Sequence, residues 1–202
     1  MPATVTSDLD TQVDRLVALG WPSLAGLSEE AFRARLAPLS ELAVAEPFVL
    51  VVPRRLVDPH AAVASLELRG RPGFTSMEPD ELAAFRPVAD VEVPDMDAYL
   101  LLDVDPGPDT LNLPPQVALP RIWAAGRSPL TVEEGVALVA QQPEILSEGN
   151  CFSLAGSRCG DKRVPAIWLS AKRSRLGWCW QGAPHTWLGT ASCGGRVAPV
   201  SC

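Results

Sequence analysis

The sequence predicts an α+β protein, with helices and isolated strands in the N-terminal part and an antiparallel β-meander in the C-terminal part. Apolar residues recur at helical spacing early in the chain. Two short apolar runs, 48–52 and 99–104, stand alone between helical patterns, as isolated buried strands do. After residue 150, short aromatic and apolar segments follow one another between turn residues. Helices first and strands last is the order typical of the α+β class.

The first two helices have clear start and stop signals. Leu9, Val13 and Leu16 recur at helical spacing, Asp8 or Ser7 can cap the start, and Gly20 marks the end of that helix. Ser28 is an N-cap residue, and the two glutamates that follow it complement the positive end of the helix dipole. We therefore expect two amphipathic helices before the first strand.

The middle of the chain predicts four more helices. Asp58 is an N-cap residue with proline next to it, and its helix is expected to reach about Leu68. A short helix is expected around 79–85, and another over 115–125. The segment 131–134 has the sequence of a capping box, TVEE, which predicts a helix that continues to about residue 142.

Four short segments after residue 150 predict the meander. They lie at 151–155, 164–169, 176–180 and 186–191, and the turn residues between them suit hairpins. If consecutive segments pair, all four strands are antiparallel neighbours. We expect this sheet to pack against the earlier helices.

Length and composition predict a single domain over 1–202, with N-terminal helices at 1–45, a mixed part at 46–150 and the Cys/Trp-rich meander at 151–202. The chain has 202 residues, of which 47% are hydrophobic and 20% charged, enough for an ordinary packed core. No apolar run approaches the roughly 20 residues that span a bilayer. The first residues lack the basic and apolar regions of a secretory signal, so a cytoplasmic location is expected.

Charge is unevenly distributed along the chain. The formal net charge is −7, which argues against a nucleic-acid partner. Ten acidic residues and one basic residue lie between Glu78 and Asp109, whereas one acidic and seven basic residues follow Cys151. The two regions either face each other in part or form separate acidic and basic surfaces.

The five cysteines all lie after residue 150, at Cys151, Cys159, Cys179, Cys193 and Cys202. An odd number of thiols in a reducing compartment predicts free cysteines. Four of them and His185 have the spacing C-x7-C-x19-C-x5-H-x7-C, which lacks the C-x2-C knuckle of common zinc sites. The aspartates at 103–109 lack the glycine and distal glutamate of an EF-hand. The sequence therefore predicts no metal and no cofactor.

Five unusual sequence motifs follow one another along the chain, and together they resemble a known family. They are GRSPLTVEEG at 126–135, GSRCGDKRVPA at 156–166, LGWCW at 176–180, PHTWLG at 184–189 and ASC at 191–193. From about Pro47 to Arg196 the chain resembles a family of uncharacterised actinobacterial proteins, a domain of unknown function. The resemblance implies no activity, cofactor or site residue, because that family has none assigned.

Cys159 and His185 are the candidate catalytic residues. Arg158, Lys162 and Arg163 flank Cys159, and their positive charges favour a thiolate. His185 can act as the base if the meander brings it close. In the alternative interpretation, Cys159 is a hairpin residue and His185 a hydrogen-bonded loop residue.

The tryptophans of the meander suggest a binding surface. Strand alternation places Trp178 and Trp180 on one face and Cys179 on the other. Tryptophans beside arginines can stack on a planar or anionic molecule. Core packing explains the same residues without a ligand.

Two function classes stay open from the sequence. The first is a binding protein or enzyme for a small molecule, anionic or planar, with its pocket bounded by Trp178, Trp180, His185 and the basic residues Arg158, Lys162 and Arg163. The alternative is a non-enzymatic interaction module, which binds an acidic partner or a second copy of itself. A membrane partner is not expected.

Overall fold

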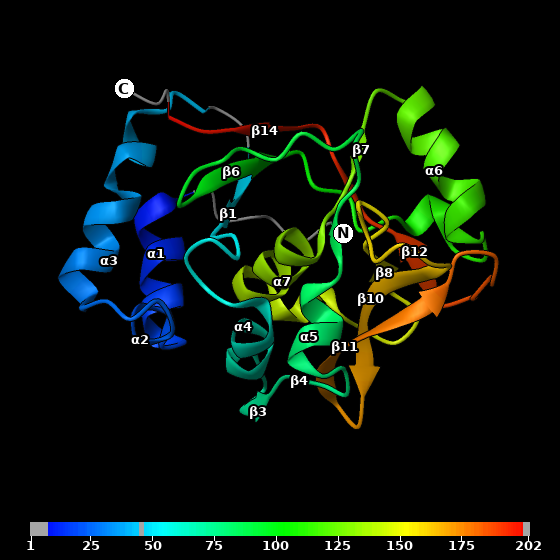
Figure 1. The fold of residues 1–202 in the computed structure, drawn as a ribbon, viewed down its shortest axis with the longest axis horizontal. Helices are drawn as coiled ribbons and strands as arrows, with labels where there is room; N and C mark the ends of the chain where they lie inside the picture. The colour runs from blue at the N-terminus through cyan, green and yellow to red at the C-terminus, as the bar shows by residue number, and fades with distance from the viewer. Residues whose placement is uncertain (1–7, 45–46, 200–202) are drawn as a thin grey trace.

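The computed structural model describes residues 8–44 and 47–199, and it confirms the α+β class. Three helices lie together at the N-terminal side of the molecule, namely α1 (Leu9–Ala18), α2 (Trp21–Leu24) and α3 (Glu29–Leu36) (Figure 1). The side chain of Asp8 accepts from the amides of Asp10 and Thr11, and that of Ser28 accepts from Ala31. These caps confirm the predicted starts of α1 and α3. No separate sequence signal predicted α2.

The first sheet joins two predicted strands with a third that the sequence did not indicate. β1 (Phe48–Val51) and β6 (Tyr99–Leu102) pair antiparallel, and β14 (Gly195–Val197) adds to the other edge of β6. In this register Arg196 lies opposite Leu101. The C-terminal segment therefore returns to the strands of the N-terminal half.

The second sheet has the order β12-β8-β10-β11-β4. Its members are β12 (Leu188–Thr190), β8 (Cys151–Ser153), β10 (Arg163–Ser170), β11 (Arg173–Trp180) and β4 (Phe74–Thr75). β8, β10 and β11 are antiparallel neighbours, as the meander requires.

The fourth predicted strand needs a correction, because β12 pairs parallel with β8 and does not pair with β11. The connection after β11 is hydrogen-bonded to the segment before helix α6 (Pro115–Ala124) and to the start of that helix. Gln116 donates its amide to the carbonyl of Gln181 (3.0 Å), and Asn112 donates to that of His185 (2.9 Å). The chain thus crosses to the far edge of the sheet. The edge beside β11 is taken by β4, also in parallel.

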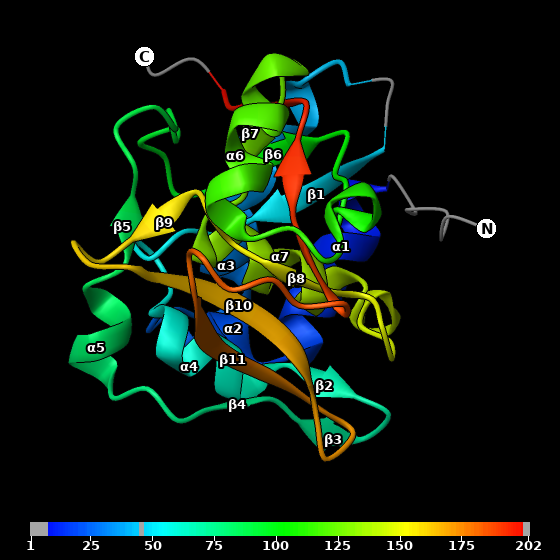
Figure 2. The same ribbon diagram turned by 90° about the vertical axis from the view of Figure 1, so that its right-hand side faces the viewer.

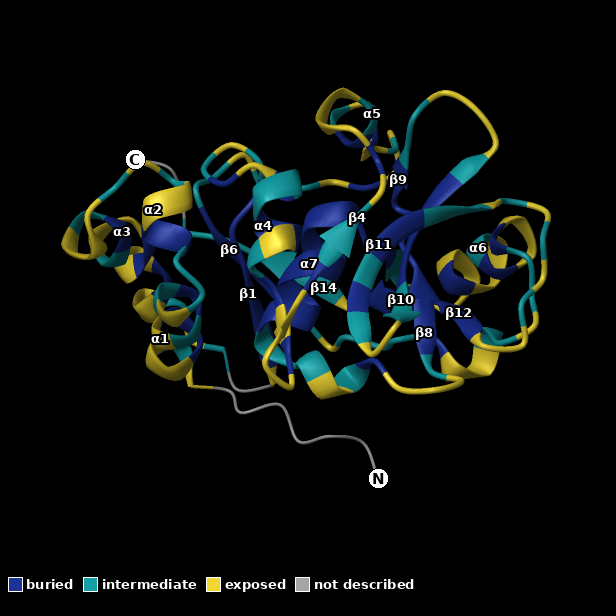
Figure 3. Cartoon of the chain, turned by 90° about the horizontal axis from the view of Figure 1, so that it is seen from below, coloured by how far each residue is buried: buried dark blue, intermediate teal, exposed yellow. Residues whose placement is uncertain are grey.

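Helix α7 (Val132–Gln141) lies centrally, between the two sheets (Figures 1 and 3). Residues 132–140 are all buried, so this helix has no solvent face. A Cβ atom on Gly135 would lie 2.3 Å from the Leu154 side chain, which explains why a glycine occupies this closest approach to the β8 side. The capping box predicted the helix, and tertiary packing buries it from every side.

The remaining elements surround this centre (Figure 2). The helices are α4 (Pro59–Ser65), α5 (Pro79–Ala83) and α6 (Pro115–Ala124), with 3-10 turns η1 (Ala37–Glu41), η2 (Pro108–Thr110) and η3 (Pro143–Ile145). Short paired strands complete the fold: β2 (Glu67–Leu68) with β3 (Arg71–Pro72), β5 (Arg86–Pro87) with β9 (Ser157–Arg158), and β7 (Ser128–Pro129) with β13 (Ser192–Cys193). α4 ends before the predicted Leu68, because the chain reverses into the β2–β3 hairpin. None of the described helices is long and apolar enough to cross a bilayer.

The acidic middle and the basic C-terminal part touch directly. Arg163 forms an ion pair with Glu81 of α5 (2.5 Å), and β5 pairs with β9, which places Arg86 opposite Arg158. The two regions therefore face each other in part.

Candidate functional site

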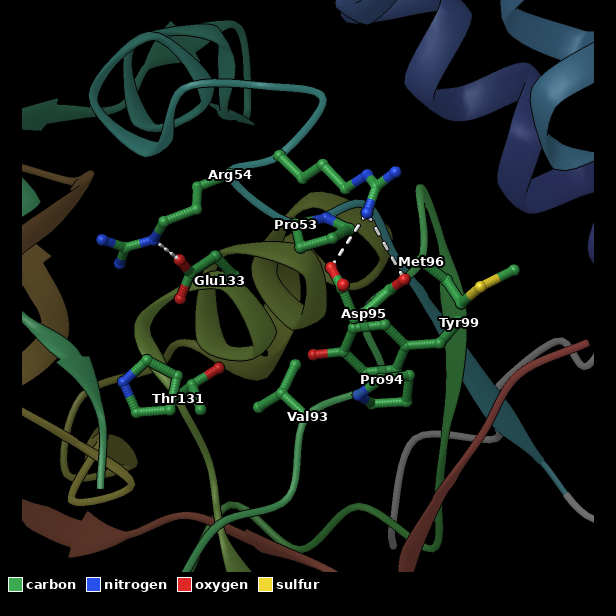
Figure 4. A pocket seen from close by; sticks show the side chains of 11 residues that line it. Pro53, Arg54, Val93, Pro94, Asp95, Met96, Tyr99, Thr131 and Glu133 are labelled. Atoms are coloured by element: carbon green, nitrogen blue, oxygen red, sulfur yellow. Dashed lines mark hydrogen bonds and ion pairs between the residues drawn. The ribbon is translucent and has the colours of Figure 1, made fainter. Parts of the chain in front are cut away.

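A cavity of about 200 Å³ opens beside the N-terminus of α7 (Figure 4). Its polar lining consists of Arg54, Arg55, Asp95, Tyr99, Thr131 and Glu133. Its apolar lining consists of Pro53, Pro87, Val93, Pro94 and Met96. The residues come from the end of β1, the segment before β6, β6 itself and the start of α7, so segments far apart in the sequence form one wall.

The capping box fixes the start of α7. The amide of Thr131 donates to Glu134 Oε2 (2.8 Å), and the amide of Glu134 donates to Thr131 Oγ1 (3.4 Å). The amide of Val132 donates to the hydroxyl of Ser157 (3.0 Å). Amides that a helix start leaves without helical partners are thus satisfied by side chains, and an acidic pair lies at the positive end of the helix dipole.

Behind the cavity, Glu134 is fully buried and bonded by donors from three elements. The hydroxyl of Tyr99 donates to Oε1 (2.8 Å), and Arg196 of β14 donates to both carboxylate oxygens, with Nη2 2.8 Å from Oε2. Arg196 also donates to Ser128 Oγ (2.7 Å). This network joins α7 to β6 and β14, and it supplies the opposite charge that a buried carboxylate requires.

The network fixes the protonation of Tyr99 and Arg196. Burial, first of all, and the charge of Glu134 raise the pKa of the Tyr99 phenol well above its ordinary value. Burial by itself would lower the pKa of Arg196, but its hydrogen bonds to Glu134 raise it above the ordinary value. Tyr99 therefore keeps its proton, and that proton is directed at Glu134. The lone pairs of the phenol oxygen are left as acceptors.

Glu133 is the polar group that the cavity leaves partly unbonded. It is 8% exposed, and its Oε1 accepts from Arg54 Nε. Its Oε2 is buried and has no hydrogen-bond partner among the described residues. In Figure 4 the Glu133 carboxylate points toward Arg54, on the same side of the view as Thr131. A buried carboxylate oxygen without a donor is costly, so its place in a cavity wall points to an external donor.

Arg54 is held in position by three partners. Besides Glu133, it donates to the carbonyl oxygens of Ala83 (3.1 Å) and Phe85 (2.7 Å), just after α5. Its neighbour Arg55 donates to Asp95 (2.9 Å) and Asp97 (3.0 Å) at the rim. The arginines of the lining are therefore engaged with the protein itself.

A second, more open hollow of about 720 Å³ is lined in part by Arg196 and Ser128 of the Glu134 network. Trp123 of α6, which is 38% exposed, lines it together with Ala89, Asp90 and Glu92. Because this hollow is wide and open to solvent, a molecule bound in it would be less shielded from water than one bound in the smaller cavity.

Cys159, the predicted nucleophile, is half-buried on the turn after β9. Its thiol donates to Asp161 Oδ1 (3.3 Å). Burial, and then the hydrogen bond to Asp161, raise the pKa of this thiol, and the opposing effect of Arg163 is smaller. These surroundings favour the thiol over the thiolate. A catalytic role for Cys159 stays a prediction.

The basic residues around Cys159 have protein partners. Arg163 bonds Asp161 (2.8 Å) and Glu81, and its guanidinium lies 5.7 Å from the ring centre of Trp178. Arg158 donates to the carbonyl of Asp161 (3.2 Å) and to the side chain of Gln181.

Lys162 is exposed, as is Trp180 at 52%. The rings of Trp178 and Trp180 are 5.0 Å apart in an edge-to-face arrangement, which confirms that they share one face. A ligand role for these residues stays a prediction.

The structure does not join His185 to Trp178. The ring of His185 lies 5.2 Å from Trp187, whose ring lies 6.3 Å from Trp168. Trp168 is opposite Arg175 in the β10–β11 register, and residues 175 and 178 of one strand point to opposite faces. His185 is half-buried, and its carbonyl oxygen accepts from Asn112. The predicted site is thus divided between the two faces of the sheet.

The residues of the cavity had partial signals in the sequence. Tyr99 is the only tyrosine of the chain, and Glu134 belongs to the clearest helix signal. The pairing of Glu133 with Arg54 and of Glu134 with Arg196 joins residues 79 and 62 positions apart, respectively. No local pattern encodes such contacts.

The described cysteines, Cys151, Cys159, Cys179 and Cys193, are free, and Cys202 lies outside the described residues. Over 8–44 and 47–199, no three His, Cys, Asp or Glu side chains form a group that could hold a metal ion.

The free energy of unfolding should decrease in alkaline solution, because two thiols whose pKa is raised by burial lose their protons there. Burial raises the pKa of Cys179 and Cys193 to about 11, from an ordinary value of 9.0. The folded state then holds these protons more tightly than the unfolded state. The stabilisation by these protonated thiols is fully present below pH 9 and is lost as the pH rises from 9 to about 11. The loss in the free energy of unfolding is on the order of 1–2 kcal/mol per thiol.

Urea unfolding at about pH 8 and about pH 10.5, under reducing conditions, measures this decline. The variant Cys179→Ala/Cys193→Ala should lose less stability between the two pH values than the wild type, and the remainder belongs to groups such as Tyr99. An unchanged difference would show that these thiols do not titrate as described.

These features define an α+β protein with a largely apolar cavity at the start of a central buried helix. The chain belongs to a family of unknown function (DUF5701), whose model matches residues 15–199. The match begins well before Pro47, so it includes α3 and part of α1, which the sequence resemblance left out. Comparison with curated proteins and with solved structures found no match.

Two of the sequence motifs that carry the family resemblance are in contact behind the cavity. The motif at 126–135 includes the start of α7, and the motif at 156–166 includes Ser157, whose hydroxyl accepts a hydrogen bond from the Val132 amide. A Cβ atom on Gly156 would lie 2.5 Å from the carbonyl oxygen of Pro129. The two segments are therefore packed backbone against backbone behind the site.

Proposed function

We propose that this protein binds a small, largely apolar molecule in the cavity at the start of α7. The observation that carries the proposal is Glu133 Oε2, a buried oxygen in the cavity wall that has no donor among the described residues. Proteins rarely leave such an atom unsatisfied, and a ligand that donates to it removes the cost.

Size and rigidity support the same function. A volume of about 200 Å³ lies below the roughly 300–1,000 Å³ of pockets for drug-sized molecules, so it suits a smaller ligand. Tyr99 is fully buried and fixed by Glu134, and Arg54 is fixed by three bonds. A site built on side chains that are already held loses little entropy on binding.

The cellular setting is part of the proposal. We place the protein in the cytoplasm, where free thiols are the norm, because the four described cysteines are unpaired with one another. An origin of this family in actinobacteria stays a prediction, as does the choice between a binding protein and an enzyme.

A second candidate is the outer face of the β10–β11 hairpin, which carries Trp168, Arg173 and Arg175. The ring of Trp187 lies near Trp168, and that of His185 lies near Trp187. Arg173 lies 4.5 Å from the Phe74 ring and Arg175 5.2 Å from the Trp168 ring. Neither arginine has a carboxylate partner in the described part of the chain. Uncompensated cations beside half-exposed rings suit a planar anion.

Amide chemical shifts in two-dimensional NMR spectra distinguish the two candidates. Isobutanol serves as the small apolar probe and naphthalene-2-carboxylate as the planar anion. We expect isobutanol to shift the amides of Val93, Tyr99, Thr131 and Glu133. Val93→Trp, which fills the cavity from its rim, should abolish these shifts. Val117→Trp, on the exposed side of α6 (40% exposed), is the matched control and should retain them.

The proposal fails if neither isobutanol nor its amine analogue isobutylamine shifts the cavity amides, or if Val93→Trp binds isobutanol as the wild type does. Shifts by naphthalene-2-carboxylate confined to the Trp168–Trp187 face, with none in the cavity from either probe, would favour the second candidate.

A further inference from the structure

The lining of the cavity includes a buried acceptor, and both arginines of the lining are bonded to other groups of the protein. Glu133 Oε2 is a buried oxygen that has no partner among the described residues. The Tyr99 hydroxyl gives its proton to Glu134 at 2.8 Å, so its oxygen can only accept from the cavity side. A buried carboxylate oxygen, and a phenol oxygen whose proton is already donated, both favour a ligand with N–H or O–H hydrogens.

The cationic side chains of the lining do not compete for that role. Each nitrogen of the Arg54 guanidinium donates one hydrogen bond. Nε donates to the Glu133 carboxylate, Nη1 to the Ala83 carbonyl and Nη2 to the Phe85 carbonyl. Arg55 is paired with Asp95 and Asp97. A carboxylate or phosphate entering the cavity would meet the negative charge of Glu133, while the positive charges of Arg54 and Arg55 are already paired with carboxylates.

We propose that the ligand of this cavity carries a primary ammonium group, which donates to Glu133 Oε2 while its alkyl part packs on Val93 and the prolines. The inference rests on the proposed binding function and adds the ligand class.

Charge selects the ammonium over a neutral hydroxyl. The oxygen that awaits a donor belongs to a carboxylate, and hydrogen bonds between charged groups are roughly twice as strong as those between neutral groups. Glu133 is 8% exposed, so water screens this interaction little. The volume of about 200 Å³ limits the alkyl part to a few carbon atoms.

Three probes of nearly equal size test the inference: isobutylamine, isobutanol and isobutyrate, titrated at pH 7 with the amide shifts of the cavity as the readout. We expect isobutylamine to bind about tenfold more tightly than isobutanol, or better, and isobutyrate to leave the cavity amides unshifted. In Glu133→Gln the preference for the amine should fall to about onefold, with isobutanol still bound.

Glu144→Gln is the matched control, because Glu144 is an exposed carboxylate paired with Arg69 (2.6 Å) away from the cavity. It should keep the wild-type preference, which excludes a general effect of net charge. The ratio of the dissociation constants of isobutylamine and isobutanol is measured on the wild type alone, so the test holds even if Glu133→Gln folds poorly.

Equal binding of amine and alcohol in the wild type, or binding of isobutyrate as strong as either, would overturn the inference and leave the proposed function standing. Absence of cavity shifts from all three probes would overturn both.

Discussion

Arg196→Met is expected to lower the free energy of unfolding by about 3–5 kcal/mol, because it leaves the Glu134 carboxylate buried without its cation. The Arg196 side chain is 7% exposed and that of Glu134 is fully buried, so water cannot replace the lost charge. Tyr99 and the Thr131 amide still donate to Glu134, but neither carries a positive charge. Urea-induced unfolding of the purified variant measures the loss.

The double variant Arg196→Met/Glu134→Gln should recover a large part of that loss, since glutamine keeps the capping box and removes the buried charge. Arg69→Met is the matched control, because Arg69 and Glu144 form an exposed pair, and it should change stability little. A loss in Arg196→Met no larger than in Arg69→Met would contradict the role given to the buried pair.

Gly156→Ala is the second substitution with a large expected effect, a loss of roughly 1–3 kcal/mol or more. Its new Cβ would lie 2.5 Å from the Pro129 carbonyl oxygen and 2.7 Å from that of Leu130, and both are backbone atoms. The amide of Gly156 also donates to Leu130 (2.9 Å), so separation of the two segments breaks a hydrogen bond. The start of α7 would shift with them.

Gly195→Ala is the control for this substitution, because a Cβ there meets nothing within 4 Å. Thermal and urea unfolding of the two variants should differ clearly, with Gly195→Ala close to the wild type. Equal stability of the two variants would mean that the segment at Gly156 adjusts without cost.

The sequence predicted those helices and strands that are determined by residues close to them in the chain. Asp8, Ser28 and Thr131 cap helices with their own side chains, and all three starts were expected from neighbouring residues. Alternation along β11 likewise placed Trp178 and Trp180 on one face, which their ring separation confirms.

Contacts between distant segments could not be predicted in this way. The position of β12 depends on hydrogen bonds from Gln116 and Asn112, which hold the connection after β11. The candidate site depends on the return of β14, which brings Arg196 to Glu134. A three-residue strand with the sequence GRV has no periodicity that would reveal its neighbours. The concentration of thiols, tryptophans and cations after residue 150 therefore drew attention away from the cavity.

A crystal soaked with 2-bromoallylamine, a three-carbon amine that fits the size of the cavity, tests the central claim most directly, because the bromine can be located by its anomalous scattering. We expect one bromine peak in the cavity at the start of α7, with the amine nitrogen within hydrogen-bond distance of Glu133 Oε2 and no such peak in crystals of Val93→Trp. A peak only at the Trp168–Trp187 face, or a cavity that stays empty in the wild type, would contradict the assignment of the binding site.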